Sequence, residues 1–277
     1  MPSSSPPEHS RQQSKQRPRP QRLGITTASA QNQKGGVGKT TTAANVGALV
    51  ARRGGRVLVV DTDPQFALTR QLGLDARSLG VNLVDVLAGR ASATDAVVRG
   101  VHGVDVIPAA GELAGVEMSL VGELGRERFL HDALEALIEE YDEVVIDTPP
   151  NLGLLTVNAL VCADTVIAPV SAEDEGAVHG ILELRVTIGK LAKRLGGEAP
   201  PLIAVVTRWS PTRVSSRSVE DQLTAAGLPP VARIRLRSAL VAEAAAARVP
   251  VATLAPDSCI ALAYDDVVEL LAGRAAR

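Results

Sequence analysis

The chain has 277 residues, a formal net charge of −2 and 45% apolar residues, an ordinary balance for a globular core. Its two cysteines, Cys162 and Cys259, stand far apart, so the sequence indicates neither a disulfide framework nor a cysteine metal site. No apolar run reaches transmembrane length and the N-terminus lacks the apolar segment of a signal peptide, so we expect a soluble cytoplasmic protein. Aromatic residues make up only 2%, and a core of Val, Leu, Ile and Ala suits a parallel sheet covered on both faces.

Residues 1–22 are rich in Pro, Ser, Gln and Arg and show no apolar period, which predicts a disordered tail. The tail has five basic residues against Glu8, a formal charge of about +4 that leaves about −6 for the remaining chain. Two interpretations stay open. The tail is a solvated segment without a task, or it is attracted weakly to DNA, to a partner or to an anionic membrane.

From residue 23 to residue 277 short apolar runs alternate with helical patterns, and we expect a single domain. The predicted strands are Leu23–Ala30, Arg56–Asp61, Val104–Pro108, Glu143–Asp147, Thr165–Val170, Leu202–Thr207 and Val231–Leu236. The predicted helices are Thr41–Arg53, Leu83–Ala88, Gly125–Tyr141, Leu152–Val161, Ala177–Leu195, Ser216–Ala226, Ser238–Arg248 and Ser258–Leu271. This alternation predicts an α/β fold with a doubly wound, mostly parallel sheet, helices on both faces, and a ligand at the carboxyl ends of the strands.

Residues 34–41, between the first predicted strand and helix, read Lys-Gly-Gly-Val-Gly-Lys-Thr-Thr. The last part matches the phosphate-binding pattern G-x-x-x-x-G-K-[ST], although Lys34 stands where the first glycine belongs. Glycines let the backbone wrap a phosphate, and the helix N-terminus holds the anion. In this pattern Lys39 reaches the phosphates and Thr40 binds Mg²⁺. Lys34 cannot share the position of Lys39, so we expect it to point toward a nucleotide in a second subunit. The alternative is a plain glycine-rich turn.

Two further predicted strands end on carboxylates. Arg56–Val60 leads into Asp61-Thr62-Asp63, and Val144–Ile146 leads into Asp147. Two carboxylates one residue apart repel each other and need a partner, which Mg²⁺ and an attacking water would supply. The alternative is an aspartate pair that caps the next helix.

Together these segments resemble the deviant Walker A ATPases of the ParA/MinD superfamily, most of all the ParA (Soj-type) partitioning proteins. Lys34–Thr41 resembles the deviant Walker A loop, Asp61–Gln65 the second motif, and Val144–Pro150 the Walker B strand and its turn. The order of elements is similar over residues 23–272. The resemblance implies a P-loop NTPase fold, ATP and Mg²⁺ as cofactors, and an ATP-bridged homodimer. It assigns the phosphates to Lys34, Gly35, Gly36, Val37, Gly38, Lys39, Thr40 and Thr41.

The resemblance also assigns roles within this set. Asp63 orients the attacking water, while Lys34 and Lys39 neutralise the charge that develops during phosphoryl transfer. The residues expected to hold Mg²⁺ are Thr40, Asp61 through water, and Asp147 from beyond the waters bound to the metal, since Mg²⁺ keeps several of its waters. In ParA proteins the adenine base is contacted at the positions that correspond here to Thr207-Arg208 and Pro230–Arg233. The residues of this chain differ from the family pattern there, so we assign no base contact.

Six arginines fall within thirty positions, namely Arg208, Arg213, Arg217, Arg233, Arg235 and Arg237. Arg213 and Arg217 lie near the start of a predicted helix, where the positive end of the helix dipole disfavours a cation. A bound phosphate there would interact favourably with both the arginines and the helix N-terminus. By resemblance, Arg235 matches and Arg213 approximates a DNA-contacting arginine of ParA proteins. We expect binding to backbone phosphates without sequence preference, and the alternative is a solvated surface with scattered arginines.

The resemblance therefore implies a dimerising ATPase that binds DNA nonspecifically, associates with the nucleoid, and segregates chromosome or plasmid DNA with a ParB-like centromere-binding partner. The alternative function is a nucleotide switch that recruits or positions a protein without a DNA role. The last predicted helix carries Asp265, Asp266 and Glu269, unlike the basic amphipathic helix of a membrane-bound relative, so no membrane partner is expected.

Overall fold

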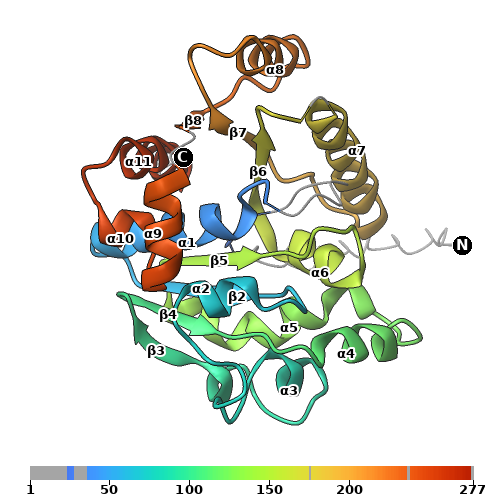
Figure 1. Cartoon of the computed structure of the whole chain (residues 1–277). Helices are drawn as coiled ribbons and strands as arrows, with labels where there is room; N and C mark the ends of the chain where they lie inside the picture. The colour runs from blue at the N-terminus through green and yellow to red at the C-terminus, as the bar shows by residue number, and fades with distance from the viewer. Residues whose placement is uncertain (1–23, 28–35, 175, 236–237, 276–277) are drawn as a thin grey trace, which may run out of the picture.

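The computed structural model describes residues 24–27, 36–174, 176–235 and 238–275. The predicted tail, Lys34, Gly35 and Arg237 lie outside these residues. Within the described residues, eight strands form one sheet in the order β3-β4-β2-β5-β1-β6-β7-β8 (Figure 1). The strands are β1 (Gly24–Thr27), β2 (Val57–Asp61), β3 (Val98–Val101), β4 (Val104–Ile107), β5 (Glu143–Asp147), β6 (Ala163–Ser171), β7 (Leu202–Trp209) and β8 (Ala232–Arg235). All paired neighbours are parallel except β3 and β4, which confirms the predicted doubly wound, mostly parallel sheet.

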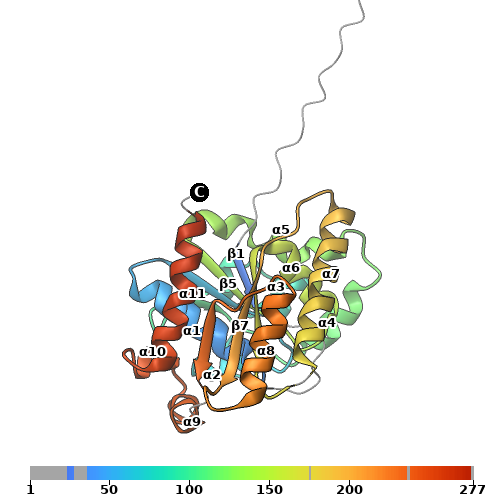
Figure 2. The ribbon, with the colours of Figure 1, turned by 90° about the horizontal axis from the view of Figure 1, so that it is seen from above.

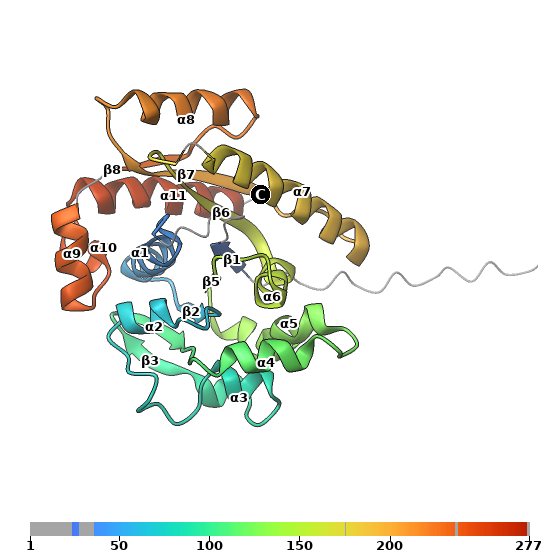
Figure 3. The same cartoon turned by 45° about the vertical axis from the view of Figure 1, so that its right-hand side comes forward.

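Helices cover both faces of this sheet. They are α1 (Lys39–Arg52), α2 (Ala67–Gln71), α3 (Leu83–Leu87), α4 (Leu113–Leu120), α5 (Phe129–Leu134), α6 (Leu154–Cys162), α7 (Ala177–Leu195), α8 (Val214–Ala225), α9 (Ser238–Ala247), α10 (Val251–Leu254) and α11 (Cys259–Ala275). Figure 2 shows α1 and α11 on one side of the strands and α7 and α8 on the other. In Figure 3, α3, α4 and α5 gather at the end of the molecule away from α8. No helix among the described residues is long and apolar enough to span a bilayer.

Strand β2 shows why these strands are apolar throughout. Val57 and Val59 pack in the cluster that contains α1 and α11, whereas Leu58 and Val60 pack in the cluster of α3 to α6. Successive side chains of a strand point to opposite faces, so a strand covered on both faces needs apolar residues at every position. All five residues of β2 are buried, including the terminal Asp61.

The predicted strands all have counterparts, but β3 was not predicted. It pairs antiparallel with β4, and Val101 lies opposite Val104 across the two-residue turn His102-Gly103. Both turn residues have positive φ, 52° and 89°, as a tight hairpin turn requires. A histidine at the first turn position is a weak hairpin signal, because asparagine, aspartate and glycine usually occupy it.

The predicted helices Thr41–Arg53 and Ala177–Leu195 correspond to α1 and α7. The single helix expected over Gly125–Tyr141 is wrong in detail, because the segment is a 3₁₀ turn (Arg126–Arg128), α5 and a second 3₁₀ segment (Glu135–Glu140). Leu130, Leu134 and Leu137 are all buried, so the apolar period that suggested one long helix reflects packing against the sheet. Helices α2, α4 and α10 were not predicted, because each is too short for periodicity to reveal.

Candidate functional site

The predicted phosphate loop ends at the start of α1, beside the carboxyl ends of the central strands. Asp61 at the end of β2 lies in register with Asp147 at the end of β5, and Asp147 also pairs with Thr27 at the end of β1. The sheet therefore brings together residues that lie up to 120 positions apart in the sequence. This is the edge where doubly wound sheets bind ligands.

Two glycines shape the described part of the loop. Gly36 and Gly38 both have φ of +97°, a conformation that glycine adopts without strain. A Cβ atom at Gly38 would lie 3.3 Å from Cγ2 of Thr207, and one at Gly36 would lie 3.0 Å from a guanidinium nitrogen of Arg208. The loop thus packs closely on the end of β7, and larger residues would push it away.

The first turn of α1 follows this loop directly. Gly38 is the N-cap residue and offers no side chain to accept a hydrogen bond from the first turn. The first N–H groups of a helix have no partner within the helix, and together with the helix dipole they favour an anion. The α1 N-terminus fits a phosphate group for this reason.

Buried polar side chains hold the start of α1 in place. Asn45 donates to the carbonyl oxygen of Thr41 at 2.7 Å and accepts from the N–H of Ala252 at 2.7 Å, so it ties α1 to α10. Thr42 contacts the hydroxyl of Tyr264 in α11 at 3.1 Å. Sequence reasoning did not single out Asn45, because a polar residue inside a helical pattern carries no signal until its partner is known.

Thr40 and Asp147 meet directly. The hydroxyl of Thr40 donates to Oδ2 of Asp147 at 2.8 Å. Burial raises the pKa of Asp147 to about 7, and the neighbouring Asp61 carboxylate adds to the shift. A hydroxyl and a buried carboxylate are oxygen groups of the kind that Mg²⁺ takes alongside substrate phosphates. The pair therefore fits the predicted metal-binding role of Thr40 and Asp147.

No group of three or more His, Cys, Asp or Glu side chains in the described part of the chain is arranged to hold a metal by itself. Mg²⁺ usually binds through one or two protein ligands together with phosphates and waters. Thr40 and Asp147 therefore fit a Mg²⁺ ion whose remaining ligands would be nucleotide phosphates and waters.

Asp61 is fully buried and its carboxylate is engaged within the protein. Oδ2 accepts from the backbone N–H and the hydroxyl of Thr69, at 2.8 and 2.7 Å, and Oδ1 accepts from the N–H of Asp63 at 3.1 Å. Burial raises the pKa of Asp61 to about 6, although these hydrogen bonds act against the shift. The geometry makes Asp61 a support for Asp63 and α2, and its expected through-water metal contact stays a prediction.

Asp63 and Lys39 complete the group. Oδ1 of Asp63 accepts from the N–H of Gln65 at 2.8 Å, and 8% of the residue is exposed. Burial lowers the pKa of Lys39, while the nearby carboxylates of Asp147 and Asp63 act to raise it. Lys39 thus lies near two carboxylates in a desolvated position, where a bound phosphate would favour its charged form.

Thr69 is a supporting residue that the sequence did not reveal. Its hydroxyl donates to Asp61 and accepts from the N–H of Ala109 at 3.0 Å, so it joins the ends of β2 and β4. Nothing in the local pattern marks a threonine in the short helix α2 as a partner of a carboxylate eight residues earlier.

We expect Thr69→Val to lower the free energy of unfolding by about 2–3 kcal/mol, because it leaves a buried carboxylate and a buried N–H short of a partner. Urea unfolding followed by circular dichroism measures this change. Thr224→Val is the matched control, because the Thr224 hydroxyl bonds only the exposed carbonyl of Glu220, and we expect a change within about 0.5 kcal/mol. Equal losses in the two variants would contradict a supporting role for Thr69.

Comparison with known proteins bears on this arrangement. A family model described as an AAA domain matches residues 25–198, more than half of the chain. An uncharacterized protein of Mycobacterium tuberculosis is 39% identical over 236 residues, which are 84% of this chain and 74% of that protein. Chromosome partitioning protein ParA of Caulobacter vibrioides is 44% identical over 177 residues, 63% of this chain and 64% of ParA. The chain belongs to the ParA/MinD family of AAA-domain ATPases. It spans just under two thirds of the length of the ParA relative.

A solved structure agrees with the ParA/MinD fold. Cobyrinic acid a,c-diamide synthase from Mycobacterium smegmatis, with a bound ATP analog and magnesium, superimposes with a TM-score of 0.76 at 32% identity, over 92% of this chain and 97% of that chain. Proteins named for different activities therefore share this fold, so the fold alone does not fix the reaction.

The described arginines of the predicted cluster lie around β7, α8 and β8. Arg213 is the N-cap residue of α8, which begins at Val214 rather than near Ser216. Arg217 donates to the carbonyl of Pro211 at 3.1 Å, and Arg233 pairs with Glu220 at 2.9 Å. The guanidinium of Arg235 lies over the ring of Trp209, 5.9 Å from its centroid.

Arg213 already has a negative partner in this structure. Its guanidinium forms a close ion pair with Glu173, and Arg208 pairs with the same carboxylate at 3.2 Å. A side chain from the loop after β6, Glu173, supplies a negative charge beside the start of α8. The phosphate contact that the sequence predicts for Arg213 stays a prediction.

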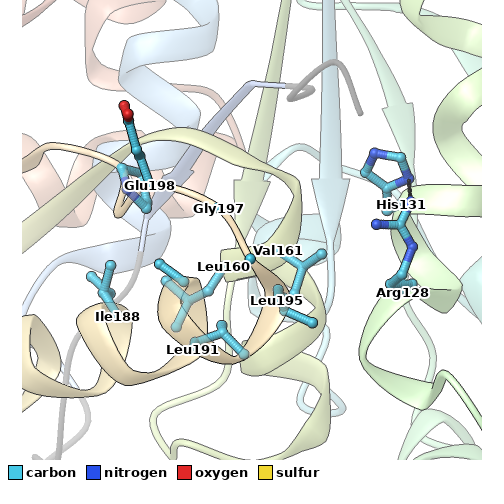
Figure 4. Close-up of a pocket in the computed structure, with 12 residues that line it drawn as sticks. Arg128, His131, Leu160, Val161, Ile188, Leu191, Leu195, Gly197 and Glu198 are labelled. Atoms are coloured by element: carbon cyan, nitrogen blue, oxygen red, sulfur yellow. Dashed lines mark hydrogen bonds between the residues drawn. The ribbon is translucent and has the colours of Figure 1, made fainter. Parts of the chain in front are cut away.

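A cavity of about 330 Å³ lies away from this edge of the sheet (Figure 4). Its wall includes Leu160 and Val161 at the end of α6, Leu191 and Leu195 of α7, and His131 of α5. None of the predicted site residues lines it. The residues that surround it precede β6 and β7, so the cavity is at the amino ends of these strands, and the predicted nucleotide site is at the carboxyl ends.

Proposed function

We propose that this chain is a partition ATPase that binds Mg²⁺-ATP, dimerises around it, and holds nonspecific DNA in the dimeric state. The observation that carries the proposal is the convergence of the Gly36–Thr40 loop with Asp63 and Asp147 at one edge of the sheet. The relatives named for chromosome partitioning share this family. The proposal includes association with the nucleoid and stimulation by a ParB-like partner.

The residues of the chain have separate tasks in ATP hydrolysis. The loop and the α1 N-terminus bind the phosphates, and Lys39 stabilises their charge. Asp63 holds the attacking water in line, since its carboxylate is the partly accessible one of the three aspartates at this edge. Thr40 and Asp147 hold Mg²⁺, which shields the phosphate charge when bound.

Dimerisation rests on Lys34, which lies outside the described residues. In the proposed dimer it contacts the phosphates bound by the partner subunit, so that each subunit completes the site of the other. ATP then shifts the monomer–dimer equilibrium because it binds the dimer better than the monomer. Hydrolysis by such switch-type sites is slow without a partner, on the order of 10⁻⁴ to 10⁻² per second in comparable GTPases.

DNA binding rests on the arginines of β7, α8 and β8. One subunit offers few phosphate contacts, and the ATP dimer doubles them, so DNA retention depends on ATP through avidity. No base-reading motif accompanies these arginines, so binding ignores sequence. Each phosphate contact adds about 0.9 to the slope of log affinity against log salt.

Replacing Arg213 and Arg235 together by glutamate is expected to abolish ATP-dependent retention of DNA and to leave ATP-driven dimerisation intact. The reason is that each substitution turns a phosphate contact into a repulsion. Fluorescence anisotropy of a labelled random duplex, with and without ATP at several salt concentrations, measures retention, and light scattering measures dimerisation.

The control is Arg77→Glu with Arg90→Glu, the same charge change at two exposed arginines near α2 and α3. Retention by the control but not by Arg213→Glu/Arg235→Glu supports the proposed surface. If the wild-type protein with ATP retains no DNA even at low salt, the chain is instead a nucleotide switch that acts on a protein partner.

A further inference from the structure

Glu173 lies between two arginines from different elements. It is in the loop that follows β6, Arg208 is near the end of β7, and Arg213 caps α8. Both guanidinium groups donate to its carboxylate, one to each oxygen. These hydrogen bonds, that of Arg213 first, lower the pKa of Glu173. The two arginines thus form an anion site that is now filled by a carboxylate of the same chain.

Short hydrogen bonds connect this site to the phosphate loop. The N–H of Ala172, next to Glu173, donates to the carbonyl of Thr207 at 2.9 Å. The hydroxyl of the same Thr207 donates to the carbonyl of Val37 at 2.8 Å. The loop that carries Glu173 and the loop that would hold phosphate are therefore fixed to one residue at the end of β7.

Arg208 makes the connection electrostatic. Its backbone has φ of 51°, which is uncommon for a residue other than glycine. In this conformation one guanidinium nitrogen contacts Glu173 while the other is 3.0 Å from the position of a Cβ on Gly36. A negative charge bound at the phosphate loop would therefore compete with Glu173 for this guanidinium.

We propose that Glu173 is an internal counter-ion that covers Arg208 and Arg213 in the nucleotide-free chain. When a bound nucleotide draws Arg208 away, Glu173 loses one of its two ion pairs, and a backbone phosphate of DNA replaces it on Arg213. The inference rests on the proposed function, because it requires that the chain bind DNA. DNA affinity would then be regulated within each subunit by Glu173, in addition to the avidity of the dimer.

The exchange is possible because the ion pairs lie at the surface. The side chains of Arg208 and Arg213 are 45% and 47% exposed, and that of Glu173 is 31% exposed. Exposed ion pairs contribute little to stability and are easily replaced by another anion. One additional phosphate contact changes affinity by about eightfold at 0.1 M salt, given a slope of about 0.9 per contact.

The test is DNA affinity without nucleotide. Glu173→Gln keeps the size of the side chain and removes the charge, and we expect it to raise affinity for a labelled random duplex about eightfold at 0.1 M salt. The salt slope should steepen by about 0.9, and ATP should increase affinity less than in the wild type. Light scattering of the nucleotide-free protein should show a monomer, which would exclude a contribution from avidity.

Two controls isolate the site. Glu183→Gln makes the same charge change on α7, where Glu183 pairs with His179 at 3.1 Å, and should leave affinity unchanged. Glu173→Gln combined with Arg213→Glu should lose the gain. An affinity of Glu173→Gln equal to that of the wild type or of Glu183→Gln would overturn the counter-ion role. Wild-type protein that retains no DNA even with ATP would instead overturn the proposed function itself.

Discussion

Asp63→Asn is expected to lower ATP turnover by about 100-fold or more while Mg²⁺-ATP binding and ATP-driven dimerisation persist. A side chain that positions or deprotonates the attacking group contributes about 10² to 10⁴ to the rate. The amide of asparagine still offers an oxygen to the N–H of Gln65, so the local fold is kept and only the charge is lost. Phosphate release measures turnover, and a fluorescent ATP analog measures binding.

The outcome for Asp63→Ala should be similar, with some loss of local order because the Gln65 N–H loses its partner. Asp95→Asn serves as a control, since Asp95 bonds only to Ser92 on an exposed turn. Wild-type turnover in Asp63→Asn would move the water-positioning role elsewhere at this edge, with Asp61 as the next candidate.

We expect substitutions of the two loop lysines, Lys39 and Lys34, to affect different properties, nucleotide affinity and dimerisation. Lys39→Ala should weaken nucleotide affinity by about 100-fold or more, because it removes the cation proposed to contact the phosphates and takes positive charge away from Asp63 and Asp147. Lys34→Ala should keep nucleotide affinity within a few fold and lose the ATP-driven dimer, because its proposed contact is to the partner's phosphates. Titration with a fluorescent ATP analog and light scattering with ATP measure the two properties.

Lys190→Ala is a suitable control, as Lys190 is an exposed residue of α7 far from the loop. A Lys34→Ala protein that dimerises with ATP as readily as the wild type would sink the cross-subunit role. A Lys39→Ala protein with unchanged nucleotide affinity would contradict the assignment of the loop itself.

Local pattern was sufficient for the main elements of the fold. The alternation of apolar strands and helical periods predicted a parallel sheet with helices on both faces, because a strand buried on two sides, such as β2, must be apolar at every position. Local pattern failed where other forces decide the structure. The β3–β4 hairpin depends on a His-Gly turn, and the segment 125–141 keeps its apolar period although its backbone changes between 3₁₀ and α geometry.

The residues of the nucleotide site were likewise present in the sequence, because glycine, lysine and threonine at fixed spacing and carboxylates at strand ends carry a chemistry of their own. The sequence by itself therefore determined the fold class, the family and the loop that we propose binds phosphate. What only the tertiary structure decided is which partner each side chain has. Asp61 is held by Thr69, Thr207 ties the loop to β7, and Glu173 fills the space between Arg208 and Arg213. Such contacts join residues from separate elements, so their energies depend on distances that packing sets and that no local pattern records.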